Sequence, residues 1–474
     1  MKGLLGILLL WGGCLSAVTV RPDFSNATLP PNIAPLNFDV MDATGRVQTT
    51  LLATSGDKLE FTGEEVRWPR RGWHEFLARH AGESVVLQVQ EGTVPVYTST
   101  NAISRDPIDA YLTYRLIPPG YSGFGAIGIW QRHLESFSER PVYRNLQKSS
   151  TQCVNCHTYN QADPDTYLFH TRLEGTGTRF VSRKHGKSFR AITTPSGMKP
   201  TYPAWHPSGD WVVFSANETF QVFYETGRDK IEVADLRGEL MLYSLADGAV
   251  QMIEDRRNRL ECFPAWDPAG QRLFTCCARV GESGPGYKDG VDETFHSLTN
   301  VCYDLVVRTF DPATRAFSEP QILLDGPANQ VSVTFPRVSP DGRWLVMTVG
   351  RRGMFHVWHG EADLWLVDLR ANTVRTLTEL NSPASESYHC FSSNGRWMVF
   401  SSRRGDGTYT RPYLAHFDPA TGVFSTPFLL PFEKPADDDN LMKSFNVPEF
   451  STGPVKESPR ELRDLKAWRG VKHQ

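Results

Sequence analysis

Residues 202–215, YPAWHPSGDWVVFS, determine the fold of this chain, because they join a short apolar strand to a second apolar strand through a Pro-Ser-Gly turn. Three later stretches repeat the pattern: residues 263–274 read FPAWDPAGQRLF, residues 335–347 read FPRVSPDGRWLVM, and residues 389–401 read HCFSSNGRWMVFS. Each stretch is typical of a β-hairpin that carries its own turn residues.

A further apolar segment ending in a turn follows each hairpin, namely Leu240–Ser244, Leu305–Thr309, Leu364–Asp368 and Tyr413–Phe417. Separate hairpins cannot bury both faces of their strands, whereas sheets arranged radially around an axis can. The repeats, spaced by about 50 to 70 residues, therefore predict a β-propeller of about five to six blades over residues 201–450, followed by a tail over residues 451–474.

The composition agrees with an all-β protein of more than one domain. The chain has 474 residues, of which 40% are hydrophobic, and its 38 Gly and 32 Pro indicate many turns. Short strand-like runs in the first third of the chain predict a β-sandwich-like domain over residues 22–145, with a short helix near residues 74–79. With 50 Lys and Arg against 53 Asp and Glu, the chain has no basic field that would favour nucleic acid as a partner.

The N-terminus has the layout of an export signal, which we assign to residues 1–17. Met1 and Lys2 precede an apolar run from Leu4 to Trp11 that is too short to span a bilayer. Cleavage after Ser16 or Ala17 and lipoprotein processing at Cys14 are the two alternatives. We expect a protein of the periplasm or cell envelope, whose contact with a membrane is limited to an N-terminal lipid; the lipid form would be an outer-membrane lipoprotein.

Residues 151–158, TQCVNCHT, contain the spacing C-x-x-C-H. Two thiols at this spacing can add to the vinyl groups of haem while the following imidazole binds the iron. A redox dithiol would need a βαβ context and a zinc site would need a second ligand pair nearby, and neither is visible. The motif predicts one haem c on Cys153 and Cys156, with His157 as a ligand of the iron. Residues 146–200 would form the haem-binding segment and the first blade.

The sixth iron ligand remains open at this stage. His170 lies shortly after the motif, and the turn-forming Asp163-Pro164-Asp165 would let the chain fold back over the haem. Met198, the nearest methionine, is the alternative. The remaining alternatives for the sixth position are His206, His389 and a site left open to a small molecule.

The chain also resembles a family of exported bacterial proteins, named TolB-like, in which one C-x-x-C-H motif precedes a propeller. The resemblance covers nearly all of the mature chain and depends on these stretches: PPNIAPLNF at residues 30–38, AYLTYRLIPPGY at 110–121, CVNCH at 153–157, FSSRR at 400–404 and TRPY at 410–413. Leu168-Phe169-His170 looks like a feature of this family. The resemblance implies a haem-bearing propeller.

Five more cysteines follow the motif, namely Cys262, Cys276, Cys277, Cys302 and Cys390. Cys276 and Cys277 point to opposite faces of one strand, so one of them can meet Cys262 or Cys302 while the other is buried. The alternative is that all five are small buried apolar residues.

These observations predict an exported monohaem c-type cytochrome that transfers electrons with a protein partner. The alternatives are an assembly or binding module of an envelope complex, and a haem-dependent enzyme acting on a small molecule. The sequence has no G-x-S-x-G or H-E-x-x-H motif. We therefore favour an electron carrier or binding protein over an enzyme.

Overall fold

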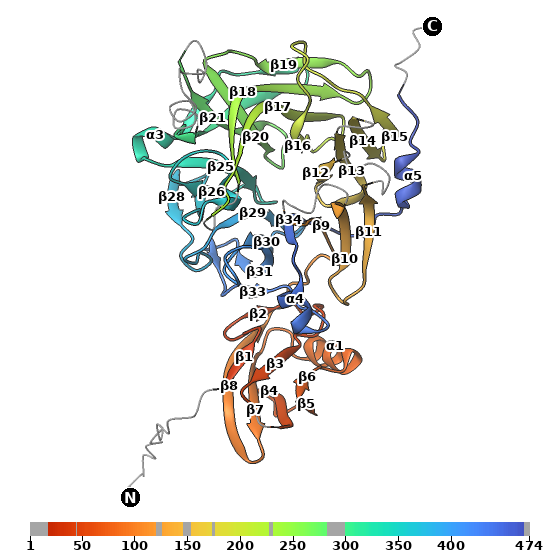
Figure 1. Cartoon of the computed structure of the whole chain (residues 1–474), viewed down its shortest axis with the longest axis vertical. Coiled ribbons are helices and arrows are strands. Elements are labelled where there is room, and N and C mark those ends of the chain that lie inside the picture. Colours follow the sequence, from red (N-terminus) through yellow and green to blue (C-terminus); the bar gives the residue numbers. More distant parts are fainter. Residues whose placement is uncertain are drawn as a thin grey trace, which may run out of the picture.

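The computed structural model describes residues 18–43, 45–119, 126–145, 153–172, 176–226, 231–281 and 299–468. The predicted signal peptide, including Cys14, lies outside these residues, and so do residues 146–152 of the predicted haem-binding segment. The described residues form an N-terminal domain and a ring of six sheets, which we number as blades 1 to 6 (Figure 1). Among them, no helix has the length and apolar character to cross a membrane.

Four blades come from the four repeats, and their strands follow one another along the chain. Blade 3 contains β16 (Thr201–Trp205), β17 (Trp211–Phe223), β18 (Ile231–Ser244) and β19 (Val250–Glu254). Blade 4 contains β20 (Arg259–Trp266), β21 (Arg272–Arg279), β22 (Asp304–Asp311), β23 (Ala316–Phe317) and β24 (Gln321–Leu324), and blade 5 contains β25 (Ser332–Val338), β26 (Trp344–Gly350), β27 (Asp363–Asp368) and β28 (Thr373–Thr376). Blade 6 contains β29 (Glu386–Phe391), β30 (Trp397–Ser402), β31 (Arg411–Asp418), β32 (Val423–Phe424) and β33 (Phe428–Leu429). Each hairpin predicted from the sequence is the first strand pair of its blade.

Two blades show no such repeat in the sequence. Blade 2 contains β12 (Cys153–Asn160), β13 (Asp163–Arg172), β14 (Gly177–Ser182) and β15 (Gly186–Arg190), and blade 1 contains β9 (Tyr111–Ile117), β10 (Gly128–His133), β11 (Glu139–Arg144) and β34 (Ser444–Ser451). The first hairpin of blade 2 turns through Gln161 and Ala162, both at positive φ, instead of through a Pro-x-Gly turn. The described residues therefore form a six-bladed β-propeller, which confirms the predicted all-β class and the predicted propeller of five to six blades.

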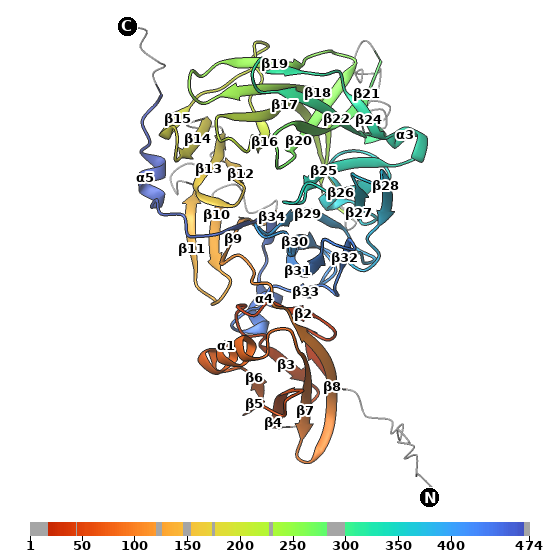
Figure 2. The same ribbon diagram turned by 180° about the vertical axis from the view of Figure 1, so that it is seen from behind.

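The last strand of the ring closes it. Strand β34 pairs antiparallel with β9, and in both views of the ring it lies beside β9 (Figures 1 and 2). The sequence placed residues 22–145 in one N-terminal domain, but β9, β10 and β11 belong to the ring. The reason is that their inner partner is more than 300 residues away in the chain, so no local pattern reveals the pairing.

The innermost strand of every blade carries a β-bulge at the same place. One non-glycine residue per strand has positive φ, at Cys156 (53°), Tyr202 (36°), Phe263 (53°), Phe335 (50°), Tyr388 (48°) and Val447 (50°). The ladder of hydrogen bonds shifts register at each of these positions, which we call the bulge residues. Proline follows the bulge residue in blades 1, 3, 4 and 5, where the interrupted ladder needs no N–H donor.

The bulge residues of neighbouring blades pack on one another at the axis of the ring. The ring centroids of Tyr202 and Phe263 lie 4.3 Å apart, those of Phe263 and Phe335 4.0 Å, and those of Phe335 and Tyr388 4.4 Å. Tilted aromatic pairs at these separations are favourable. The axis is therefore packed by side chains at this level.

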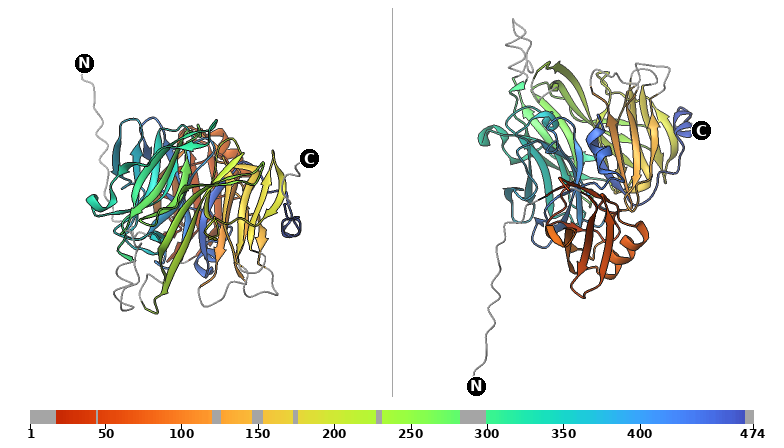
Figure 3. Two further views of the ribbon diagram at one scale, coloured as in Figure 1. Left: turned by 90° about the horizontal axis from the view of Figure 1, so that it is seen from above. Right: turned by 60° about the horizontal axis from the view of Figure 1, so that its bottom comes forward.

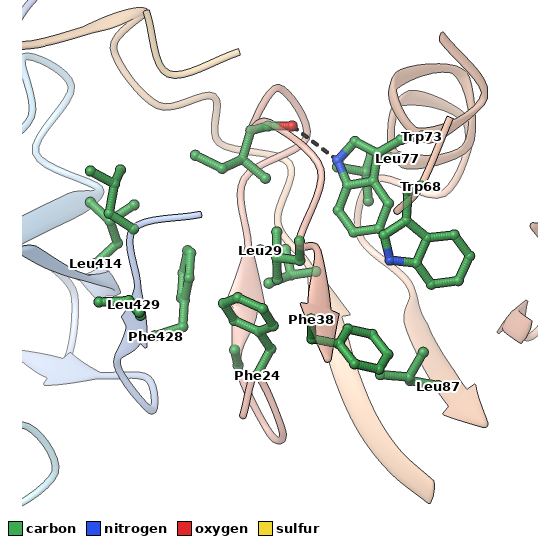
Figure 4. Close-up of a cluster of buried hydrophobic side chains, with 14 of the residues drawn as sticks. Phe24, Leu29, Phe38, Trp68, Trp73, Leu77, Leu87, Leu414, Phe428 and Leu429 are labelled. Carbon is green, nitrogen blue, oxygen red and sulfur yellow. Dashed lines mark hydrogen bonds between the residues drawn. The ribbon is translucent and has the colours of Figure 1, made fainter. Parts of the chain in front are cut away.

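The N-terminal domain consists of two sheets and a helix. The five-stranded sheet contains β2 (Thr28–Leu29), β4 (Val47–Ala53), β5 (Lys58–Gly63), β7 (Ser84–Glu91) and β8 (Val94–Ile103); the smaller sheet contains β1 (Thr19–Arg21), β3 (Phe38–Met41) and β6 (Glu65–Val66); and the helix is α1 (Arg70–Arg79). The Trp73 indole of α1 donates to the Ile33 carbonyl at 3.0 Å (Figure 4). This domain forms a separate lobe beside the ring, drawn in red and orange in Figure 3.

The lobe is attached to blade 6 by an apolar core and by hydrogen bonds. Phe24 and Leu29 pack with Phe428 and Leu429 of β33 in one buried cluster (Figure 4). The Trp397 indole at the start of β30 donates to the Asp106 carbonyl at 3.0 Å. The two domains therefore share core packing.

Short helices occupy the remaining described loops, namely α3 (Gly326–Asn329), η3 (His356–Trp358), α4 (Pro435–Asn440) and α5 (Pro459–Arg463). A capping box formed by Ser458 and Glu461 starts α5. The Arg179 guanidinium of blade 2 donates to the Leu462 carbonyl at 2.9 Å. The predicted C-terminal tail is thus anchored on blade 2.

Trp397→Ala is expected to lower the free energy of unfolding by about 3 to 5 kcal/mol, because the substitution leaves a large cavity in a fully buried position. It should also increase proteolytic release of the lobe, since the Asp106 bond is lost. Urea unfolding and limited proteolysis measure the two effects. Trp344→Ala is the matched control, because the Trp344 indole donates to Pro419 inside the ring. Equal release of the lobe from both variants would contradict this role of Trp397.

Candidate haem-attachment site

The C-x-x-C-H motif lies on β12, the innermost strand of blade 2, where Cys156 is the bulge residue. Cys153 and Cys156 are both free thiols and both half-exposed. In a regular strand, residues three apart point to opposite faces. The bulge interrupts this alternation, so both thiols belong to the half-exposed side chains of β12, whereas Val154, His157 and Tyr159 are buried.

The His157 imidazole is buried against blade 1, with 5% of its surface exposed. Main-chain groups of Thr113 and Val447 and the Arg115 guanidinium lie close to the ring. Neither ring nitrogen makes a hydrogen bond of ordinary geometry within the described residues. Burial, reinforced by the Arg115 charge, lowers the pKa of His157 to about 4, so the imidazole is neutral at physiological pH. A neutral imidazole with a free lone pair is the form that binds a metal.

Two arginines lie on either side of Cys153. The Arg115 Nη2 atom of β9 lies 3.5 Å from the Cys153 Sγ atom. Arg172 is the register partner of Cys153 on β13. The Nε atoms of both arginines are buried without a hydrogen-bond partner.

Cys156 is an electrostatic neighbour of two other bulge residues, Tyr202 and Tyr388. Burial raises the pKa of Tyr202 and of Tyr388, the bulge residues of blades 3 and 6, and the charge of Cys156 adds to both effects. The second thiol therefore adjoins the aromatic packing at the axis, while Cys153 adjoins blade 1.

His170, the first candidate for the sixth ligand, is on β13 opposite Asn155 and has 2% of its surface exposed. Its Nδ1 atom is 2.9 Å from Thr178 Oγ1, and its Nε2 atom is buried without a partner. Burial lowers the pKa of His170 to about 3. The ring packs against Phe214 of blade 3, at a centroid distance of 5.6 Å. His157 and His170 thus lie on opposite faces of the blade 2 sheet.

The other three candidates are held elsewhere. Met198 is half-buried in the turn before β16, where its N–H donates to Thr194 Oγ1. Both ring nitrogens of His206 are engaged, with Ser208 Oγ at 2.9 Å and the Gly270 carbonyl at 3.0 Å. His389 follows the bulge residue of blade 6, as His157 does in blade 2, and its Nε2 atom is 2.8 Å from the Val346 carbonyl.

Glu449 adjoins the motif, although nothing in the local sequence singled it out. One carboxylate oxygen accepts hydrogen bonds from Thr158 Oγ1 and from the Tyr159 N–H, both at 3.0 Å. Burial raises the pKa of Glu449 to about 7. The residue lies two positions after the bulge residue of β34. The dipeptide Val447-Pro448, which matches Phe263-Pro264 and Phe335-Pro336, is the signal that would have revealed this strand as a sixth inner strand.

Of the remaining cysteines, Cys262, Cys276 and Cys277 lie on strands of blade 4, Cys302 lies just before β22 of the same blade, and Cys390 lies on β29 of blade 6. Cys262 is the register partner of Cys276, and Glu261 is the register partner of Cys277. The sequence offered Cys276 and Cys277 as possible partners of Cys262, and Cys276 is the one that lies opposite Cys262 in the strand pair. All of the cysteines among the described residues are free thiols. In the same part of the chain, no three His, Cys, Asp or Glu side chains are grouped closely enough to hold a metal ion.

The donor set of β12 fits a covalently attached haem. Two free, half-exposed thiols would form the thioether bonds, and a buried neutral imidazole with no hydrogen bond would bind the iron. Most buried polar side chains in proteins are hydrogen-bonded. Nitrogens of His157, Arg115 and Arg172 that make no hydrogen bond of ordinary geometry border the two thiols, and a group bound there would meet them.

Comparisons with known proteins found similarity to solved structures but not to known sequences. No protein-family model matches the sequence, and no curated protein matches it. Among solved structures, TolB from Acinetobacter baumannii is similar with a TM-score of 0.43 and 12% identity, over 78% of this chain and 79% of TolB. A hypothetical selenium-binding protein from Sulfolobus tokodaii is similar with a TM-score of 0.42 and 10% identity, over 90% of this chain and 99% of that protein.

A puromycin-hydrolyzing peptidase from Mycobacterium tuberculosis is also similar, with a TM-score of 0.34 and 12% identity, over 73% of this chain and 45% of the peptidase. The class that the structure itself defines is a closed six-bladed β-propeller preceded by a β domain.

Glu449→Gln is expected to become more stable relative to the wild type as pH rises from 4.5 to 7. The folded pKa of about 7 lies above the ordinary value of 4.5, so the wild type is most stable below pH 4.5 and loses stability as the carboxyl ionises. Gln keeps a carbonyl that accepts from Thr158 and Tyr159 and never ionises. The gain should reach at most about 3 kcal/mol above pH 7. Urea unfolding at several pH values measures it, with the exposed Glu218→Gln as control. A difference that does not change with pH would exclude this role of Glu449.

Proposed function

We propose that this chain is an exported monohaem c-type cytochrome, with haem c attached to Cys153 and Cys156 and with His157 as an iron ligand. The observation that carries the proposal is the buried His157 imidazole, which makes no hydrogen bond of ordinary geometry and lies next to two free thiols at C-x-x-C spacing. Haem bound here would supply one-electron chemistry. The predicted signal at residues 1–17 supports a location in the periplasm or cell envelope.

The residues around the motif would bind and shield such a group. His157 is held neutral by burial, so it needs no deprotonation before it binds a metal. The aromatic bulge residues beside Cys156 exclude water from the axis of the ring. A site bordered by packed side chains suits electron transfer with a redox protein more than conversion of a substrate.

A binding or assembly module of an envelope complex is the second candidate function. The observation that favours it is the fold, because a closed propeller joined by shared core packing to a separate lobe provides a rigid docking surface. A haem-dependent enzyme for a small molecule is the third, and it requires an iron with an open position. The ligation state of the iron separates the first function from the third.

Replacing Cys153 and Cys156 together by Ala is expected to abolish covalent haem stain on a denaturing gel, because each thiol forms its own thioether bond. The protein is expressed with a haem-attachment system in an exported form. Cys262→Ala with Cys276→Ala is the matched control, since those thiols are fully buried in blade 4. Stain that persists in the Cys153 and Cys156 variant would show that the proposed cofactor is wrong.

His170 remains our candidate for the sixth ligand, because its Nε2 atom is buried and free whereas the ring nitrogens of His206 are engaged. Since His157 faces blade 1, ligation by both imidazoles requires one of the strands β12 and β13 to shift. His170→Ala with haem attached should turn the optical spectrum from low-spin to high-spin and allow carbon monoxide to bind. A low-spin spectrum that does not change would exclude His170, and Met198→Ala would be measured next.

A further inference from the structure

We propose that Arg115 is the positioning residue that sets the reduction potential of the haem bound at Cys153, Cys156 and His157, by holding an uncompensated positive charge beside the attachment site. This inference rests on the proposed function and identifies the electrostatic control of that site.

Arg115 reaches the motif from another blade. It lies on β9 of blade 1, where its register partner is Asn446 of the closing strand β34. Its Nη2 atom is 3.5 Å from Cys153 Sγ, and its charge acts on the His157 ring and on Tyr388 at the axis. One guanidinium therefore borders the first thiol and the imidazole together.

Arg115 is half-buried, and it differs from the arginines of the ring that pair with carboxylates. Arg308 pairs with Glu254 and Glu261, and Arg404 pairs with Glu386. The described residues offer Arg115 no carboxylate at ion-pair distance, and its Nε atom is buried without a partner. Arg115 therefore places a positive charge beside the Cys153 thiol without an ion-pair partner among the described residues.

The expected effect follows from Coulomb's law. Oxidised iron carries one more positive charge than reduced iron, and a fixed cation nearby disfavours that additional charge. Guanidinium remains charged throughout the accessible pH range, so the effect does not depend on pH. Screening by solvent is weaker at a half-buried site than at the surface. Arg115 thus favours the reduced state and raises the reduction potential.

The test is a spectroelectrochemical titration of the intact, haem-loaded protein carrying Arg115→Gln or Arg115→Lys. The Gln variant should have a more negative midpoint potential than the wild type, and the Lys variant should stay close to the wild type because it keeps the charge. Arg140→Gln is the control, since Arg140 is exposed on β11 of the same blade and its removal changes the net charge equally. We expect Arg140→Gln to leave the potential unchanged.

Two results would overturn the inference: a Gln variant that stains for haem and titrates like the wild type, or Gln and Lys variants that shift equally. If the Gln variant fails to mature, the Lys variant decides, because it must then mature and titrate like the wild type. Absence of stain from the wild type would instead mean that the proposed function is wrong. A more negative midpoint potential in Arg115→Gln, with haem stain intact, supports both the proposed function and the role of Arg115.

Discussion

The pairing of β34 with β9 is the interaction on which the rest of the structure depends. It joins residues near the end of the chain to the first blade and leaves the ring without an open strand edge. Only in a closed ring do the six bulge residues meet at one axis and pack there. The same pairing brings Val447, Asn446 and Glu449 next to the strand that carries the C-x-x-C-H motif.

The motif occupies a backbone position that every blade provides. In blades 1, 3, 4 and 5 the bulge is followed by Pro, whereas blade 2 has Cys156 followed by His157. A bulge in an inner strand reorients the side chains on either side of it. The propeller therefore supplies the geometry of the candidate site, and the substitution of Pro by His supplies its chemistry. Blade 6, with Tyr388 followed by His389, has the imidazole but no cysteines at the positions that match Cys153 and Cys156.

The charged groups around β12 differ along the strand: a guanidinium lies near its start and a carboxyl group lies further along it. On the side of blade 1, burial and the Arg115 charge keep His157 neutral and leave a guanidinium beside Cys153. Further along the strand, Glu449 accepts two hydrogen bonds, and its pKa is raised to about 7. These groups come from β9 and β34, so the first and last strands of the ring together control the charge around a motif in the second blade.

The sequence alone predicted the all-β class, the four repeated blades, one further blade within residues 146–200 and the thiol-imidazole motif, because turn residues and apolar strands lie close together along the chain. Only the tertiary structure revealed blade 1 as part of the ring, the bulge shared by all inner strands, and Arg115 and Glu449 as neighbours of the motif. These features depend on contacts between residues far apart in sequence, and local patterns carry no information about such contacts. For the same reason, the sequence could order His170, Met198, His206 and His389 by distance along the chain but not by the face of the sheet on which each one lies.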